Sequence, residues 1–227
     1  SHDVPFIVED GQIVGRLVYE KMAEAPKALY GASLSSNYQA QGLKLSKQLH
    51  YLRGELQNTI YIGRIYNNLS DFKQALQLLI DSKDRAEKNG YYSLVAACLN
   101  NIGRVYSSQG DTASDIRCFR QSNELARKIG DEFWQGVTYL NIGECHLSNG
   151  MLDSARYYLN LSYDYGKLKL KINEMTGFSL SNLGTVYQQM NEPVLALQYL
   201  RSSVEYLEKD FVYDGISIAF MSMSEIF

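Results

Sequence analysis

The sequence predicts an all-α fold, a right-handed superhelix built from antiparallel helical hairpins. One set of residues recurs every 40 or 41 positions along most of the chain, and turn-forming residues separate the helix-length segments between recurrences. The 227 residues are 45% hydrophobic and 21% charged, which is typical of a packed, soluble protein and not of a disordered one. Recurrence at this period indicates a solenoid, in which each unit packs only on its neighbours.

The repeat is recognised by a glycine that follows an aliphatic residue and precedes, by three positions, an aromatic one. This glycine occurs at Gly63, Gly103, Gly143 and Gly184, with His146 in the aromatic slot of the third copy. Glycine inside a helix costs about 1 kcal/mol relative to alanine, so four at one register indicate that two helices approach closely there. We expect the residue twelve positions later, small in three copies, to be the other half of that contact.

Three further columns follow each glycine at fixed distances. They are Ala75, Asp115, Ala155 and Ala196 at twelve residues, Leu79, Phe119, Leu159 and Leu200 at sixteen, and Ser82, Ser122, Ser162 and Ser203 at nineteen.

Turn-forming residues divide each repeat into two helices. Asp71 and Asp111 are suited to cap helix starts, and Pro193 to a first helical turn. The expected helices are Gly54–Asn68, Phe72–Lys88, Tyr91–Gln109, Thr112–Ile129, Glu132–Asn149, Leu152–Lys169, Asn173–Met190 and Pro193–Lys209.

These columns resemble the tetratricopeptide repeat family, from Gly54 to the last residue. The period of 40 is similar to the long-helix branch of that family, found in N-terminal regions of bacterial signalling and regulatory proteins. Asp115, His146 and the serine column depart from the family pattern. HEAT or armadillo repeats, which have a similar period, are the alternative, but they do not need the glycine column.

The period extends weakly beyond the four clear copies. Tyr19, Met22 and Ala23 match the first helix of a preceding unit that Pro26 interrupts, and Gly42 and Ser46 match its second helix. The predicted division is 1–2 tag remnant, 3–52 degenerate N-terminal unit or cap, 53–90, 91–130, 131–170 and 171–210 complete repeats, and 211–227 the first helix of a truncated further repeat.

The composition disfavours several classes of function. A net charge of −3 without a basic run argues against nucleic acid as a partner, and no apolar run is long enough to cross a bilayer. No nucleophile elbow, phosphate loop or metal-ligand spacing occurs, so we expect no catalysis, no cofactor and no metal. The three cysteines, Cys98, Cys118 and Cys145, are expected to be buried and unpaired, which favours the cytoplasm. A periplasmic location stays open if the chain belongs to a membrane-tethered kinase.

The first helices of stacked hairpins line a concave groove, which is the expected binding surface. Two rows of polar residues, two before and one after each glycine, lie on one face of these helices. The candidate ligand-binding residues are Tyr61, Arg64, Asn101, Arg104, Asn141, Glu144 and Asn182. The asparagine amides could hold an extended peptide and the arginines a carboxylate. The alternative is that the asparagines are solvated or bridge neighbouring repeats.

The sequence therefore predicts a non-catalytic scaffold that binds a protein or peptide. The resemblance implies the sensory or regulatory domain of a bacterial signalling protein, with a histidine kinase or transcription-regulator module beyond its C-terminal end. The alternative is a structural adaptor that holds an assembly together without such an effector.

Overall fold

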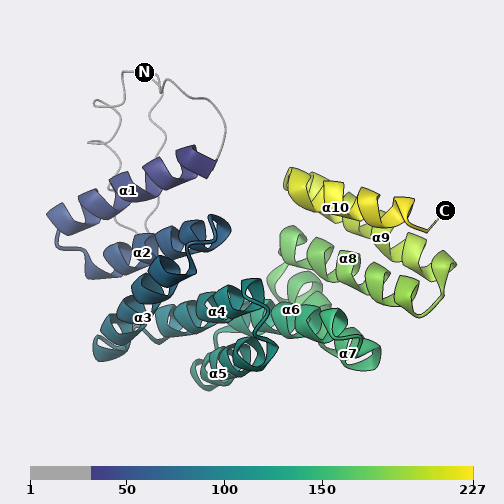
Figure 1. Cartoon of the computed structure of the whole chain (residues 1–227), viewed down its shortest axis with the longest axis horizontal. Coiled ribbons are helices and arrows are strands. Elements are labelled where there is room, and N and C mark those ends of the chain that lie inside the picture. The colour runs from purple at the N-terminus through teal and green to yellow at the C-terminus, as the bar shows by residue number, and fades with distance from the viewer. Residues whose placement is uncertain (1–31, 227) are drawn as a thin grey trace. The chain divides into compact units, whose positions relative to one another are not determined.

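The computed structural model describes residues 32–226, and every regular element of that range is a helix (Figure 1). The helices are α1 (Ala32–Gln48), α2 (Leu52–Asn68), α3 (Phe72–Lys88), α4 (Tyr92–Ser108), α5 (Thr112–Ile129), α6 (Glu132–Ser148), α7 (Leu152–Asp164), η1 (Tyr165–Leu170), α8 (Asn173–Gln189), α9 (Pro193–Lys209) and α10 (Tyr213–Ser224). The chain divides into two compact units, residues 1–38 and 39–227, and the hairpins lie in the second. The expectations at Ser1, His2, Tyr19, Met22, Ala23 and Pro26 lie outside the described residues.

The helix positions repeat as the glycine spacing predicted. Helices α2, α4, α6, α8 and α10 begin 40, 40, 41 and 40 residues apart, and α3, α5, α7 and α9 each follow one of them after a short turn. Asp71 and Asp111 accept hydrogen bonds from the backbone N–H groups of Gln74 and Ser114, and Pro193 opens α9. The fold is thus the expected all-α superhelix of antiparallel hairpins.

One segment differs from the expected continuous helix over Leu152–Lys169. After Asp164 the helix continues as the π-helix η1, which ends with Lys171 in the left-handed conformation, at a φ of 56°. A π turn holds one residue more than an α turn. Because the repeat that contains α7 is the one with 41 residues, η1 absorbs the extra residue and leaves α8 in register.

Each glycine of the repeat column lies where its helix touches the next one. A Cβ atom built at Gly103 would lie 2.6 Å from the ring of Phe119, and one built at Gly184 would lie 2.6 Å from Leu200. The side chain that covers the glycine therefore belongs to the residue sixteen positions later. The residue expected there, twelve positions later, also lies at the contact in the fourth repeat, where the backbone oxygen of Ala196 is 3.3 Å from the added Cβ.

The serine column has a polar role that the family's alanine cannot fill. Ser122 and Ser203, both fully buried, donate hydrogen bonds to the backbone oxygens of Ala96 and Gly177, each on the helix before their own. These bonds satisfy the two hydroxyls and fasten one helix to the previous one, whereas the buried hydroxyl of Ser82 has no hydrogen-bond partner among the described residues.

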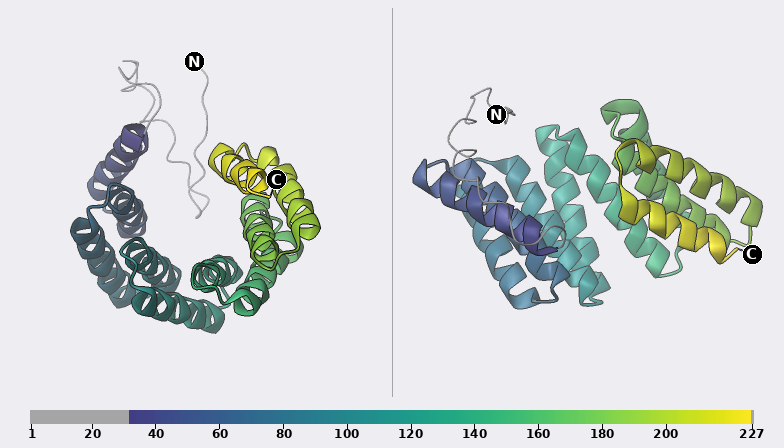
Figure 2. Two further views of the ribbon diagram at one scale, coloured as in Figure 1. Left: turned by 45° about the vertical axis from the view of Figure 1, so that its right-hand side comes forward. Right: turned by 90° about the horizontal axis from the view of Figure 1, so that it is seen from above.

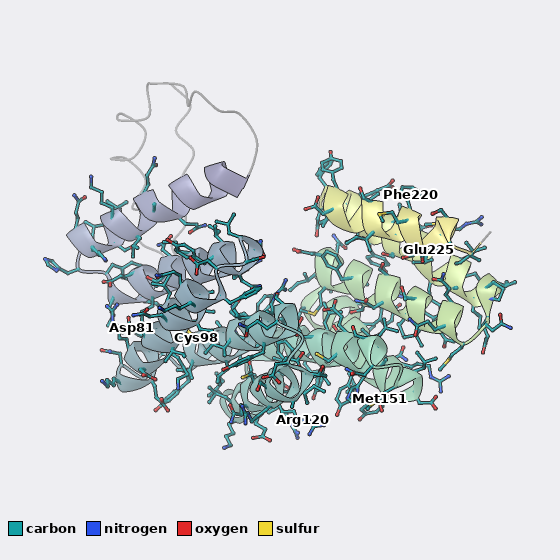
Figure 3. The ribbon with its side chains drawn as sticks, in the orientation of Figure 1. Asp81, Cys98, Arg120, Met151, Phe220 and Glu225 are labelled. Carbon is teal, nitrogen blue, oxygen red and sulfur yellow. The ribbon has the colours of Figure 1, made fainter. Side chains whose placement is uncertain are left out.

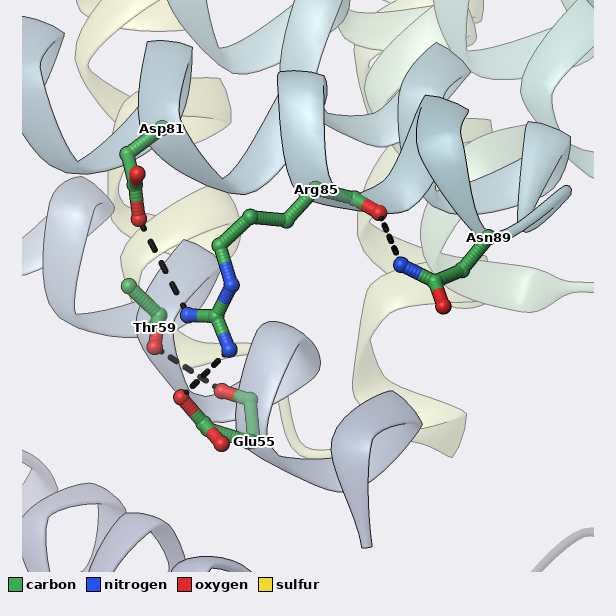
Figure 4. Close-up of polar contacts among 5 residues, drawn as sticks. All are labelled: Glu55, Thr59, Asp81, Arg85 and Asn89. Atoms are coloured by element: carbon green, nitrogen blue, oxygen red, sulfur yellow. Dashed lines mark hydrogen bonds and ion pairs between the residues drawn. The ribbon is translucent and has the colours of Figure 1, made fainter.

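A polar network also fastens the first complete hairpin. Arg85 on α3 donates to Glu55 on α2 over 2.8 Å, and its other terminal nitrogen lies 3.8 Å from Asp81 (Figure 4). Thr59 donates to the backbone oxygen of Glu55, and Asn89 to that of Arg85. The Glu55–Arg85 pair therefore crosses between the two helices, and each residue is held by its own helix as well.

The even-numbered helices form one continuous surface. Helix α2 contacts α4, α4 contacts α6, α6 contacts α8 and α8 contacts α10, whereas α3, α5, α7 and α9 make no such contacts with one another. Within residues 39–226 the hairpins follow one another along a curve (Figure 2). The helices that touch lie on the inside of such a curve. We call the exposed surface of α2, α4, α6 and α8 the inner face.

Candidate functional site

All seven predicted site residues lie on the even-numbered helices. Tyr61 and Arg64 are on α2, Asn101 and Arg104 on α4, Asn141 and Glu144 on α6, and Asn182 on α8. Tyr61, Arg64 and Arg104 are exposed, Glu144 and Asn182 are partly buried, and Asn101 and Asn141 are buried.

Three of these residues surround one small pocket between α2 and α4. The pocket has a volume of about 30 Å³ and is lined by Arg64, Asn67, Asn68, Asn101 and Arg104. Every side chain in its wall is polar or charged. In the described part of the chain, neither guanidinium group has a hydrogen-bond or ion-pair partner, although Arg64 lies over the ring of Tyr61 at 5.5 Å.

The pocket concentrates positive charge. The protein around Arg64 displaces water from its guanidinium group, and this burial lowers the pKa of Arg64, with the positive charge of Arg104 lowering it further. The negative charge of Glu174 offsets part of this lowering, and Arg104 in turn interacts with Glu144.

Two amides of the pocket wall donate hydrogen bonds, one within its own helix and one to the neighbouring helix. Asn101 is 5% exposed, and its Nδ2 donates to the backbone oxygen of Ala97 over 2.8 Å. Asn67 donates to the Ser108 hydroxyl over 3.1 Å, which ties α2 to α4. The Oδ1 of Asn67 is buried and receives no hydrogen bond within residues 32–226.

The other two predicted asparagines bridge neighbouring repeats. Asn141 donates to the Oδ1 of Asn100 over 2.6 Å, and Asn182 donates to the Oε1 of Glu144 over 2.9 Å. Burial raises the pKa of Glu144, and the hydrogen bond from Asn182 and the charge of Arg104 partly offset that rise. The amides of Asn141 and Asn182 therefore bridge neighbouring repeats, as in the alternative given for the asparagines in the sequence analysis.

The seven residues therefore form two groups and one bridge. Arg64, Asn101 and Arg104 share the pocket, with Tyr61 beside it; Glu144 and Asn182 form a pair; and Asn141 bonds to Asn100. The sequence reasoning missed Asn67 and Asn68, which follow Arg64 by three and four residues and so share its helix face. That spacing could have assigned both residues to the binding face.

Other features of the described residues do not form a second polar centre on this face. The thiols of Cys98, Cys118 and Cys145 are buried and unpaired, as expected. A shallow hollow elsewhere is lined by side chains of α7 alone, among them Arg156 and Tyr157. Over residues 32–226, none of the helices has the length and apolar character needed to cross a membrane.

Comparison with protein families agrees with the repeat. Residues 55–128 match the family model described as tetratricopeptide repeat. The match favours tetratricopeptide repeats over the HEAT and armadillo alternative for the hairpins of residues 55–128.

A second family model matches a different segment. Residues 1–49 match the C-terminal domain of 2'-deoxycytidine 5'-triphosphate deaminase. The structure describes only residues 32–49 of that segment, as α1 and the start of the turn after it. The match does not reach the inner face, whose predicted residues lie between positions 61 and 182.

Known proteins share the fold at low identity. The chain is 29% identical over 105 residues to Tonsoku-like protein from Danio rerio, an alignment that spans 46% of this chain and 7% of that protein. BtubC from P. vanneervenii superposes with a TM-score of 0.68 at 11% identity, covering 87% of this chain and 84% of that one.

Two solved structures from signalling proteins are also similar. A STAND signal-transduction ATPase with a tetratricopeptide repeat sensor from Pyrococcus horikoshii gives a TM-score of 0.65 at 17% identity, covering 85% of this chain and 30% of that one. A Rap protein in complex with Competence and Sporulation Factor gives 0.60 at 14% identity, covering 86% and 58%. At these identities the likeness concerns the fold alone.

Proposed function

We propose that this chain is a non-catalytic regulatory domain that binds a protein or peptide segment along the inner face. The observation that carries the proposal is the α2–α4 pocket, where two arginines lie on the surface formed by successive even helices. A surface of this kind suits an extended segment, because each repeat can contact a successive part of the ligand.

The regulatory role is favoured over the structural adaptor by the neighbours that sense or respond to a signal. The STAND protein carries its tetratricopeptide repeats as a sensor, and the Rap protein is in complex with Competence and Sporulation Factor. Both likenesses concern the fold, so the role itself is the proposal. It includes an effector module, a histidine kinase or a transcription regulator, encoded after Phe227.

Site-specific cross-linking tests the binding face. A photo-reactive phenylalanine analogue at Tyr61, which is 47% exposed on α2, should cross-link to the partner. The same analogue at Tyr157, which is 61% exposed on α7, is the matched control and should not. Cross-links from Tyr157 alone would contradict the inner-face assignment and move the binding surface to the odd helices.

A second experiment separates the regulatory domain from the adaptor. Sequencing the parent gene beyond Phe227 should reveal a kinase or transcription-regulator module. Recovery of the partner should also depend on a signal or growth condition. A termination codon soon after this position, together with constitutive recovery of the same partner, would favour the adaptor.

A further inference from the structure

We propose that the turns leading into the even-numbered helices dock this chain on an anionic lipid surface, without crossing it. These turns lie at one end of the hairpins, and we call them together the basic rim. The basic rim consists of the segments Lys47–Tyr51, Lys88–Ser93, Lys128–Phe133, Lys167–Asn173 and Lys209–Asp214. The inference concerns a surface other than the inner face and does not depend on the ligand bound there.

Lysine is concentrated on the basic rim. The five segments contain seven lysines and four acidic residues, and all seven lysines are exposed. The residues directly before the segments include Glu87, Arg127 and Glu208, which still leaves an excess of positive charge. The turns at the other end of the hairpins contain three acidic residues and neither lysine nor arginine. These opposite turns are Asn68–Phe72, Ser108–Thr112, Ser148–Leu152 and Gln189–Pro193.

Helix stability does not account for this distribution. A cation in the last turn of a helix interacts favourably with the helix dipole, and this holds for both helices of a hairpin. Lysine occupies the last turn of α1, α3, α5, η1 and α9, whereas the last turns of α2, α4, α6 and α8 contain neither lysine nor arginine. Because the dipole would favour a cation equally in both sets, the confinement of lysine to one rim indicates a partner.

Exposed apolar side chains project from the same turns. Each of the five segments carries at least one large apolar residue, with 39 to 71% of its surface exposed. These residues are Leu49, Tyr92, Ile129, Phe133, Leu168, Phe211 and Tyr213. At a lipid surface, such side chains enter the boundary between headgroups and acyl chains while neighbouring lysines keep their ammonium groups among the phosphates. The basic rim therefore has both parts of an interfacial anchor.

Polar bonds join the segments into one surface. The pairs are Ser93 with Asp131 at 2.7 Å, Glu132 with Lys169 at 3.3 Å, and Asn173 with Asp210 at 3.0 Å. Glu55 and Arg85 connect α2 to α3 at the same end of the hairpins. Successive turns are thus held side by side, so their lysines and apolar side chains form a row.

The residue types favour lipid over an acidic protein. Protein interfaces are enriched in arginine and depleted in lysine, because the planar guanidinium group bonds acidic side chains in a defined geometry. The five segments contain no arginine at all. Lysine is a flexible point charge, which suits phosphate headgroups that move and have no fixed arrangement.

Vesicle flotation tests the partner. The probes are vesicles of phosphatidylcholine alone, and of phosphatidylcholine with phosphatidylserine in a two-to-one ratio. The chain should float with the anionic vesicles and not with the neutral ones, and added salt should release it. Lys88→Gln and Lys128→Gln should each weaken binding by about 5-fold, the effect of one lysine near an anionic surface. Lys73→Gln, an exposed change at the opposite end of α3, is the control and should leave binding unchanged.

Fluorescence quenching identifies the residues that enter the lipid. Trp134 is the only tryptophan of the chain, so Trp134→Phe allows one tryptophan to be placed elsewhere. In that background, Phe133→Trp places it on the basic rim, where Phe133 is 44% exposed. Met151→Trp places it on an opposite turn, where Met151 is 55% exposed (Figure 3). Lipids brominated on their acyl chains should quench the tryptophan at position 133 and not that at position 151.

Three results would overturn the proposal. They are the absence of binding to anionic vesicles, equal quenching at positions 133 and 151, and equal binding by wild type and the lysine variants of the basic rim. Binding of poly-glutamate without binding of vesicles would also overturn it and would assign the rim to an acidic protein. Circular dichroism of each variant, unchanged from wild type, shows that a loss of binding does not come from unfolding.

Discussion

Replacing Gly103 by leucine should force α4 and α5 apart. A Cβ atom at this position would lie 2.6, 2.8 and 3.0 Å from three carbons of the Phe119 ring, where ordinary contacts begin at 3.4 Å. Phe119 is only 1% exposed, so the ring has no free space to move into. The strain must therefore be relieved by separating the helices.

The expected magnitude combines two opposing effects. Overpacking a core costs about 1 to 3 kcal/mol, and more for a side chain as large as leucine. Leucine gains back up to about 1 kcal/mol over glycine in helix propensity. We expect Gly103→Leu to lower the free energy of unfolding by about 3 kcal/mol, and Gly103→Ala by about 1 kcal/mol.

A double-mutant cycle with Phe119→Ala identifies the cause. Phe119→Ala alone should cost about 3 to 5 kcal/mol through the cavity it leaves. The leucine at position 103 can fill part of that cavity, so the double variant should be about 1 to 3 kcal/mol more stable than the sum of the single changes predicts.

Urea denaturation followed by circular dichroism measures all four proteins. Gln121→Leu, an exposed change on α5, is the control and should stay within about 0.5 kcal/mol of wild type. If Gly103→Leu is as stable as wild type, or if the two changes are additive, the glycine is not there to admit the Phe119 ring, and the explanation of the whole column fails.

Three further predictions concern other parts of the repeat. Burial raises the pKa of the Cys98 thiol from 9.0 to about 12, so the thiol of the unfolded chain loses its proton at a lower pH than that of the folded chain. The free energy of unfolding should therefore fall as the pH rises from about 9 to about 12. Cys98→Ala should reduce that fall in urea titrations. Deleting the exposed Leu168 should convert η1 to an α-helix and change the free energy of unfolding by less than about 1 kcal/mol. Deleting Gln121 should unfold α5, because loss of one residue from an α-helix rotates all later residues by about 100° about the helix axis. Phe211 has a φ of 56°, so Phe211→Gly should raise the free energy of unfolding by about 1 kcal/mol in thermal melts, and a decrease would show that the ring makes a stabilising contact.

The helices were predictable because each has local signals at both ends. Asp71 and Asp111 cap their helices in the way their positions predicted, and Gly110 is left-handed, with a φ of 77°, in the turn between α4 and α5. The π-helix was not predicted, although the spacing of 41 between Gly143 and Gly184 contained the signal. An extra residue can enter a turn or a helix, and spacing alone does not distinguish them.

The side chain that covers each glycine was not predicted, because spacing does not give the direction of a side chain. Ala196 is small so that its backbone can approach Gly184, and Leu200, one turn later, reaches back over the glycine. Helical side chains point toward the N-terminus of their own helix, which is the direction of this reach. Both residues are needed at the contact, but only the larger one fills the space that the missing Cβ leaves.

The candidate site was predictable as a face but not as a set of contacts. Spacing placed Arg64, Arg104 and the asparagines on the first helix of each hairpin, where the structure has them. Spacing could not show that the amides of Asn141 and Asn182 donate hydrogen bonds to neighbouring helices, because those bonds depend on the offset between α4, α6 and α8. Offset is set by the packing of the whole repeat, and a sequence pattern does not record it.

Two departures from the repeat pattern place polar side chains in the core. Asp115 replaces a small residue in the core, and Ser107 and Cys145 both donate to one of its oxygens. His146 replaces an aromatic residue, and its ring stacks on Tyr158 at 5.4 Å. Each side chain keeps one buried atom without a hydrogen bond among the described residues, Oδ1 of Asp115 and Nδ1 of His146, so its neighbours satisfy it only in part.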